Sequence, residues 1–529
     1  MKNTHLLLPV VAFVIFAFSC EERNRTSQND TVVSTDSVTI AEESVEPFPD
    51  TMYASVELLT YKIDTFCTDV KGDIADIKDL YANVPGIFCF RGGPLRDMPY
   101  SGRVTGRPSR IEVDWCFKTD MDQRKVLGTS WGGGSGWTGQ PLYIKWPHDK
   151  LERIKRENNH LTSDFDDEEI IVASLCSKVY FINFNTGKAS REAMETRNPV
   201  KGTPSIDPRL NGNYYLGQGL PCEQPFGAVL YNLFTNEQKS VFGMDQDAWR
   251  NWGAYDSNPI VVGDFLIRPG ENGTLYKFLA KTDTLIKHTT LRYHEKKGWG
   301  SPGMESSIAV CRNYGYVGDN KGNILCVNLN TMKPVWCYWN HDDTDATIVL
   351  EIEDGIPYLY TSCECDKQGQ NGYSYFTKLN GLNGDTVWVQ PIPCHKRQVF
   401  GSEREGGMFS TPLIGHGNCE GLIFANFCTL DKPNLGRCCC IDKKTGRIIY
   451  SLDTELYLWS SPIAYYNEKD ELFVLFGDII GNLYLIDGKT GEILVKEKFG
   501  NNFESSPIPI GNCAVVGSRG REIYKFSIK

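Results

Sequence analysis

A short phrase recurs along this chain and limits what it can fold into. An Asn or Asp ends an apolar run and is followed three residues later by Thr and four residues later by Gly, as in IDKKTGR from Ile441 and IDGKTGE from Ile486. With looser copies included, the phrase occurs at Asn183, Asn232, Leu279, Asn328, Asn380, Asp442 and Asp487. Successive copies are 49, 47, 49, 52, 62 and 45 residues apart, which suits one four-stranded blade of a β-propeller for each copy.

The pattern inside each repeat supports the same fold. Residues 458–499 contain the apolar runs SSPIAYY, ELFVLFGD, LYLID and EILVKEK, separated by Gly, Asn and Asp. Such runs are typical of β-strands. The Asx side chain accepts backbone N–H groups of its own turn, and Gly supplies the positive φ of a hairpin. Because residues 110–529 show no sustained helical period, we predict an all-β fold.

The number of repeats predicts eight blades. Eight strand-opening phrases align on a Pro or Ile, but only seven complete Asx phrases follow them, and the last repeat stops at Lys529 after three strands. An unassigned strand at residues 111–118 contains Trp115, where a fourth strand would carry its aromatic residue. We therefore predict an eight-bladed propeller, with seven blades as the alternative, whose last blade is completed by this N-terminal strand.

The N-terminal part predicts export and a lipid anchor. After Lys2, an apolar run at residues 6–18 is too short to span a bilayer permanently, and it ends in Ser19-Cys20, which resembles a bacterial lipobox. We expect residues 1–19 to be a lipoprotein signal peptide and Cys20 to be acylated in the bacterial outer membrane. The alternative is an ordinary signal peptide cut near Cys20.

Three further segments follow the signal peptide. Residues 20–70 are rich in acidic and small polar residues, which predicts a flexible acidic tether. Residues 71–110 form a lead-in with a short helix near Ile74, Ile77 and Leu80, and residues 111–529 form the propeller.

Charge and cysteine content restrict partners and metal sites. The net charge of −11 argues against nucleic acids and anionic lipid surfaces as binding partners. We therefore expect the protein to contact the membrane only through its lipid anchor. Eighteen cysteines in an exported chain predict free thiols together with one or two disulfides. No pair of CxxC motifs has the spacing of a zinc site.

The repeats resemble those of the pyrroloquinoline-quinone (PQQ)-like propeller superfamily over about residues 86–529. The resemblance lies in LNGLNGDTVW, CIDKKTGRIIY and LIDGKTGEIL and in FRGGPLRDMPYSG at residues 90–102. It implies one of two roles: a quinoprotein dehydrogenase with PQQ and calcium in its funnel, or a non-catalytic scaffold like the outer-membrane barrel-assembly lipoprotein. The family's tryptophan eight residues after the Asx is kept only at Trp336 and Trp388; the other copies have Arg191, Ser240, Lys287, Tyr450 and Val495.

The opening phrases predict a ring of side chains around the central funnel. The position three residues before each aligned Pro or Ile is occupied by Thr138, Lys201, Asp256, Glu305, Asp345, Phe409, Trp459 and Glu504. Four carboxylates in one channel raise one another's pKa values unless Lys201, water or a cation offsets them. The alternative is that these acids bond backbone N–H groups of neighbouring blades.

Two other segments are candidate ligand sites. The glycine-rich loop around Trp131 and Trp137 could bring the faces of two indole rings to a sugar or a quinone. The alternative is that both rings pack inside the first blade and bind no ligand. Asp343 and Asp345 resemble the start of a calcium loop, although the spaced Gly and terminal Glu of an EF-hand are absent.

No catalytic residue is predicted. The chain has neither a GxSxG phrase nor an HExxH pair, and its adjacent cysteines, at residues 438–440, fall in a strand instead of a funnel loop. We therefore expect a binding or scaffold module of the bacterial cell envelope that takes an envelope protein or a small ligand at the funnel face. The alternative is a PQQ- and calcium-dependent oxidoreductase, or a glycan-active enzyme that uses funnel carboxylates.

Overall fold

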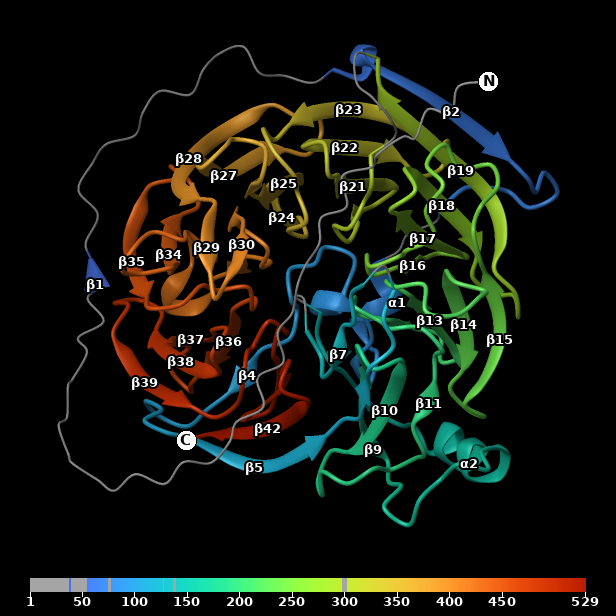
Figure 1. Cartoon of the computed structure of the whole chain (residues 1–529), viewed down its shortest axis with the longest axis horizontal. Helices are drawn as coiled ribbons and strands as arrows, with labels where there is room; N and C mark the ends of the chain where they lie inside the picture. Colours follow the sequence, from blue (N-terminus) through green and yellow to red (C-terminus); the bar gives the residue numbers. More distant parts are fainter. Residues whose placement is uncertain (1–37, 40–54, 75–77, 127, 137–138, 297–301) are drawn as a thin grey trace.

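Eight sheets surround a central axis in the computed structural model (Figure 1), which describes residues 38–39, 55–74, 78–126, 128–136, 139–296 and 302–529. Each sheet is one blade, and its strands follow one another from the axis to the rim. The prediction of an eight-bladed propeller is confirmed, and the seven-bladed alternative is wrong.

The first four blades lie between residues 142 and 339. Their strands are β8 Leu142–Lys145, β9 Glu168–Ala173, β10 Lys178–Asn183 and β11 Met194–Glu195 in blade 1; β12 Ser205–Ile206, β13 Asn213–Gly217, β14 Ala228–Asn232 and β15 Glu237–Phe242 in blade 2; β16 Ile260–Val262, β17 Phe265–Gly270, β18 Thr274–Leu279 and β19 Ile286–Glu295 in blade 3; and β20 Ala309–Cys311, β21 Tyr314–Gly318, β22 Asn323–Asn328 and β23 Lys333–Trp339 in blade 4.

The last four blades contain the C-terminal half of the chain and one N-terminal strand. Their strands are β24 Val349–Glu353, β25 Ile356–Thr361, β27 Asn371–Asn380 and β28 Thr386–His395 in blade 5; β32 Leu413–Ile414, β33 Leu422–Cys428, β34 Gly436–Asp442 and β35 Ile448–Thr454 in blade 6; β36 Ile463–Tyr466, β37 Leu472–Gly477, β38 Asn482–Asp487 and β39 Ile493–Lys498 in blade 7; and β40 Ile508–Ile510, β41 Cys513–Gly517, β42 Glu522–Ile528 and β5 Ile111–Lys118 in blade 8.

Strand β5 closes the ring as the sequence predicts. It pairs antiparallel with β42, from Ile111 opposite Ile528 to Lys118 opposite Glu522. This pairing joins the two ends of the propeller and removes an unpaired edge from each.

Short strands supplement the blades. They are β1 Val38–Thr39 on β35, β3 Gly86–Ile87 on β8, β4 Gly102–Arg103 on β36, β26 Glu364–Cys365 with β31 Gly406–Gly407, β6 Met121–Asp122 with β7 Gly132–Gly133, and β29 Arg397–Val399 with β30 Ser402–Arg404. Strand β2, Leu59–Thr65, pairs with β19 as a fifth strand of blade 3. It falls within the range predicted to be a flexible tether; it is instead ordered, because its backbone bonds to β19 and Leu59 is buried in the core.

Two α-helices and three 3-10 helices complete the elements of the described residues. The lead-in contains α1 Lys78–Ala82, near the predicted short helix, and the 3-10 turns are η1 Val56–Leu58, η2 Phe90–Gly92 and η3 Gly417–Cys419. Helix α2, His148–Glu157, contradicts the expectation of no helix after residue 110. It buries only Ile154, so its apolar stripe is too short to produce a periodic signal in the sequence.

A buried donor fixes each blade to the next one around the ring. In seven interfaces the donor bonds the backbone carbonyl of the residue that follows the Asx position: Trp115 to Phe184 (2.9 Å), Arg191 to Leu233 (2.5 Å), Tyr215 to Ala280 (2.8 Å), Lys277 to Leu329 (2.8 Å), Trp336 to Gly381 (2.9 Å), Trp388 to Lys443 (2.9 Å) and Tyr450 to Gly488 (2.7 Å). The eighth interface uses the Tyr465 hydroxyl, 2.7 Å from the Cys513 carbonyl oxygen. Arg191 and Tyr450 occupy the position of a missing tryptophan, whereas Tyr215, Lys277 and Tyr465 supply the donor from other strands of their blades.

The same contacts explain the Gly of the recurring phrase. Gly446 and Gly491 have φ of 76° in both cases, and a Cβ atom there would lie 2.7 Å from the Trp388 ring and 2.6 Å from the Tyr450 ring. The position therefore requires Gly both for its backbone conformation and for the aromatic ring of the preceding blade.

The lead-in passes through the centre of the ring and is held there by two buried arginines (Figure 1). The Arg91 guanidinium donates to the carbonyl oxygens of Pro462 (3.0 Å) and Pro412 (2.8 Å), and the Arg96 guanidinium donates to that of Ile308 (2.9 Å). These carbonyls belong to the opening phrases of three blades. The lead-in therefore closes the axis and forms the floor of the funnel.

Every cysteine in the described residues is a free thiol, so the expectation of one or two disulfides is not met there. Most of these thiols are buried within strands, where Cys packs as a small apolar residue. Cys20 lies outside the described residues. No helix among the described residues is long and apolar enough to cross a membrane.

Candidate functional site

Five of the eight predicted ring residues meet at the centre of the propeller. Lys201, Asp256, Glu305, Asp345 and Phe409 line one small cavity of about 40 Å³. They come from the segments that precede the innermost strands of neighbouring blades, which is why equivalent positions of the opening phrases lie side by side. Since one water needs about 10–15 Å³, the cavity holds a few waters or one partly hydrated ion.

The other predicted ring residues lie apart from this cavity. Trp459 is buried, and its ring packs against that of Phe409 in a tilted arrangement with the ring centres 4.9 Å apart. Glu504 accepts a hydrogen bond from Asn502 at 2.8 Å and lies 3.6 Å from Arg519, so its carboxylate is used within the fold. Trp137 and Thr138 lie outside the described residues.

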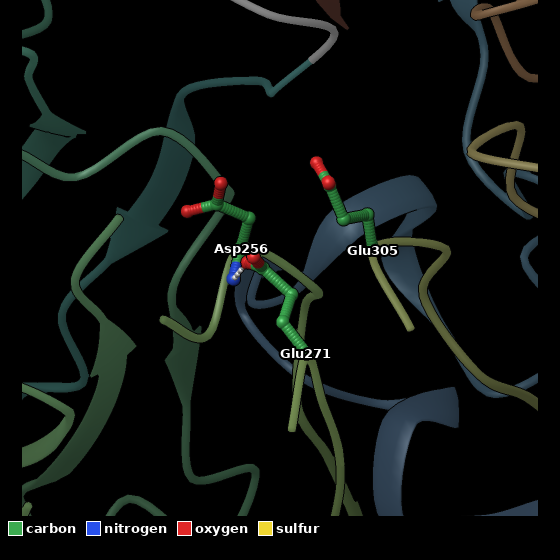
Figure 2. Close-up of side chains that lie close together, drawn as sticks. All are labelled: Asp256, Glu271 and Glu305. Atoms are coloured by element: carbon green, nitrogen blue, oxygen red, sulfur yellow. Dashed lines mark hydrogen bonds between the residues drawn. The ribbon is translucent and has the colours of Figure 1, made fainter. Parts of the chain in front are cut away.

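One group of carboxylates, which we call the first acidic cluster, consists of Asp256, Glu271 and Glu305 (Figure 2). The Lys201 ammonium lies 3.2 Å from the Asp256 carboxylate and 2.5 Å from that of Glu305. The Glu271 carboxylate accepts hydrogen bonds from the Trp252 indole at 2.9 Å and from the Asp256 backbone N–H at 3.2 Å. A built-in cation and two donors therefore compensate this cluster.

The pKa values in the first cluster follow from burial opposed by Lys201. Burial raises the pKa of Asp256 to about 6, while Lys201 lowers it and Glu305 raises it. Burial also raises the pKa of Glu271 well above its usual value. Burial alone would lower the pKa of Lys201, but Glu305 and Asp256 outweigh that effect and raise it well above 10.5. Lys201 therefore stays charged over the whole physiological range.

The second acidic cluster consists of Asp343, Asp345 and Glu364, whose nearest carboxylate oxygens all lie within 4.8 Å of one another. Among the described residues, no donor makes a hydrogen bond to any of these three carboxylates, although Glu364 is only 5% exposed. The nearest ammonium group is that of Lys367, 3.9 Å from Asp343 on a side chain that is 45% exposed. This cluster is therefore poorly compensated.

Burial and mutual repulsion keep protons on the second cluster. Burial raises the pKa of Asp343 to about 8, and Glu305 and Asp342 add to the rise against Lys367. Burial, then Glu305 and Asp343, raises the pKa of Asp345 well above its usual value. Burial, then Asp345 and Asp343, does the same for Glu364. Lys201 opposes the rise at Asp345 and Lys367 opposes it at Asp343, but neither outweighs burial and repulsion, so negative charge here would be favoured by a further cation.

Glu271 and Glu364 were missed by the sequence analysis because they are outside the opening phrases. Glu271 follows the end of β17, and Glu364 lies in the short strand β26. No periodic signal marks either position. Only the closeness of these segments to the opening phrases in space brings the two carboxylates to the funnel.

The cavity does not fit a bound quinone. Cavities that hold organic cofactors have volumes of about 300–1,000 Å³, far above the cavity of about 40 Å³ lined by the ring residues. The adjacent cysteines at residues 438–440 are buried in β34, within blade 6. The carboxylates of the second cluster, in contrast, are the oxygen ligands that Ca²⁺ prefers.

The sequence matches no known protein family and no curated protein. The fold is similar to that of solved structures. One is a europium-containing methanol dehydrogenase, with a TM-score of 0.56 and 13% identity over 85% of this chain and 100% of the other. Another is a quinohemoprotein alcohol dehydrogenase from Comamonas testosteroni, with a TM-score of 0.59 and 12% identity over 86% of this chain and 82% of the other.

BamB from Moraxella catarrhalis is also among the similar structures, with a TM-score of 0.47 and 13% identity over 70% of this chain and 98% of the other. At these identities the likeness to the two dehydrogenases establishes the fold alone. The chain shares the β-propeller fold of these two dehydrogenases. Its chemistry has to be argued from its own residues.

Proposed function

We propose that the protein is a non-catalytic, lipid-anchored binding module of the bacterial cell envelope whose funnel holds a divalent cation at the second acidic cluster. The observation that carries this proposal is the absence of any hydrogen-bond donor to Asp343, Asp345 and Glu364 in the described part of the chain. Oxygen-only ligands favour Ca²⁺. Because a buried carboxylate must be paired or protonated, a cation is the natural complement of this site.

A cation at this place would also give the funnel a means of recognition. Ca²⁺ takes six to eight oxygen ligands, and three carboxylates leave positions open. Hydroxyl or carboxylate oxygens of a small ligand, or of an acidic loop of an envelope protein, would complete the coordination. The ligand class is therefore oxygen-rich and anionic or neutral.

Calcium-dependent stabilisation tests the proposal. We expect the melting temperature in Ca²⁺ to exceed that in chelator, since a cation at 100 times its Kd stabilises the folded state by about 2.7 kcal/mol. The double variant Asp345→Asn/Glu364→Gln should lose this difference. The matched double variant Asp256→Asn/Glu271→Gln, in the first cluster, should retain it. Equal melting curves of the wild type in Ca²⁺ and in chelator would reject the cation site.

The same preparation separates binding from the enzymatic alternative. A PQQ- and calcium-dependent oxidoreductase would reduce a dye with an alcohol or sugar once both cofactors are added, and PQQ would raise the melting temperature beyond the effect of Ca²⁺. We expect neither effect. A glycan-active enzyme would produce new sugar ends by cleaving its substrate. Loss of this cleavage in Asp343→Asn would place the activity in the funnel.

The lipid anchor rests on Cys20, outside the described residues. Cys20→Ala should move the protein from the membrane fraction to the soluble fraction. Retention of this variant in the membrane would contradict the anchor while leaving the cation site intact, so the two parts of the proposal fail separately.

A further inference from the structure

Within the described residues, strand β2 presents an unpaired backbone edge at the rim of blade 3. It is the last strand of the sheet, in the order β16-β17-β18-β19-β2 (Figure 1). The Phe66 N–H donates to the His288 carbonyl at 2.8 Å, and the Lys296 N–H donates to the Leu58 carbonyl at 2.7 Å. Because the register between these pairs is unbroken, the even-numbered residues of β2 bond to β19. The odd-numbered residues direct their N–H and C=O groups outward.

The pairing of β2 with β19 is more regular than the outermost pairs of the four-stranded blades. In blades 2 to 8 the outermost pair of the four-stranded blade contains a register shift. The pairing of β2 with β19 has none, and β2 contains no Pro. A regular edge without Pro can accept a further strand along its whole length.

Exposed apolar side chains gather beside the same edge. Of the fifteen large apolar side chains exposed in the described residues, four lie between residues 58 and 70: Leu58 (47% exposed), Tyr61 (41%), Phe66 (44%) and Val70 (39%). The segment is therefore richer in exposed apolar side chains than the rest of the described chain, although Tyr61 projects from the face of the strand opposite to that of Leu58 and Phe66.

The charges of β2 are complementary to those of a second β2. We propose that two copies of this chain pair through β2 in antiparallel register centred on Ile63, which joins two blades into one continuous sheet. Within one copy Lys62 lies 3.0 Å from Asp64, which also pairs with Arg292. In the proposed register Lys62 also faces Asp64 of the second copy, and the reverse contact follows by symmetry. Tyr61 then faces Thr65 of the second copy, and both residues direct their backbone groups outward, as the pairing requires.

The blades of this chain already accept added strands at their rims. Strand β1 pairs with the outermost strand β35, and β2 itself is an addition to β19. Opposite charges and aromatic or β-branched residues facing each other across two strands contribute roughly 0.2–1 kcal/mol per pair. One strand pair buries less than the 1,200–2,000 Å² typical of a stable interface, so we expect a dimer with a Kd on the order of micromolar.

Sedimentation velocity of the full chain from about 1 to about 100 µM tests this inference. The wild type should pass from monomer to dimer. Tyr61→Pro should remain a monomer, because it removes an outward N–H and no bond to β19. Lys62→Asp should weaken the dimer at least tenfold, since it places a second carboxylate opposite Asp64 of the other copy. Lys498→Asp, the same charge change at the rim of blade 7, should leave the dimer unchanged.

Two results would overturn the inference. A wild type that stays monomeric over the whole range would assign the edge to a strand of a different protein. A dimer that persists in both Tyr61→Pro and Lys62→Asp would place the contact elsewhere. Circular dichroism of each variant separates loss of the dimer from loss of the fold.

Discussion

The two acidic clusters of the funnel contain the same number of carboxylates but differ in their compensation. In the first, Lys201 reaches Asp256 and Glu305 directly, and Glu271 accepts two hydrogen bonds. In the second, Asp343, Asp345 and Glu364 have no such partners in the described residues. Lys201 lowers the pKa of Asp345 as well, but it makes ion pairs only with Asp256 and Glu305. The number of acids alone therefore does not show which cluster is a structural ion pair and which is a candidate cation site.

Removal of Lys201 should have the largest effect. Lys201→Met leaves the buried Asp256 and the partly exposed Glu305 without their cation, and breaking a buried ion pair from one side costs about 3–5 kcal/mol. Urea unfolding measures this loss. Adding Asp256→Asn to the variant should recover part of it, and Ca²⁺ should stabilise Lys201→Met more than the wild type, because both clusters would then lack a cation. A loss below about 1 kcal/mol would show that the lysine does not compensate the first cluster.

The pH dependence of stability should distinguish the second cluster in its two states. The folded-state pKa of Asp343 is about 8, above its ordinary value of 3.8. The stability that this proton contributes is therefore fully present below about pH 4 and is lost as the pH rises through about 8.

In chelator we expect stability to fall over this range by at least about 1.4 kcal/mol, the equivalent of one pKa unit. Thermal unfolding between about pH 5 and pH 9 measures the fall. In Ca²⁺ the fall should be reduced or reversed, because the cation binds the deprotonated carboxylates. Asp343→Asn should flatten the profile in chelator, and an unchanged slope in that variant would assign the effect to other groups.

Glu305 lies between the clusters, and its removal should have a smaller effect on the second. It raises the pKa values of Asp343 and Asp345 through repulsion. Glu305→Gln should therefore shift the pH at which stability falls in chelator downward, by less than about one pH unit, because burial remains the main cause. No shift, or an upward shift, would contradict the repulsion between Glu305 and the second cluster.

The smallest effect is expected from Lys367. Its ammonium lies 3.9 Å from Asp343 on a half-exposed side chain, so the pair is worth about 0–1 kcal/mol. Lys367→Met should change stability in chelator by less than about 1 kcal/mol and strengthen Ca²⁺ binding slightly. A loss as large as that of Lys201→Met would erase the difference between the clusters.

Much of the fold and part of the site could be predicted from local patterns. The opening phrases placed Lys201, Asp256, Glu305, Asp345 and Phe409 at one cavity, because residues at equivalent positions of successive blades occupy equivalent places around the axis. The same rule failed for Glu504 and Trp459, whose side chains are used by neighbours inside the ring. Helix α2 and strand β2 were missed because neither has a long enough periodic pattern.

The sequence by itself determined the ring: the repeat spacing set the number of blades, and the unassigned strand at residues 111–118 set the closure. Only the tertiary structure decided which acids are compensated. Glu271 and Glu364 reach the funnel from segments with no repeat signal, and Lys201 comes from a different blade than the carboxylates it contacts. The physical reason is that burial and distance between charges are properties of the closed ring, whereas periodicity is a property of each blade alone.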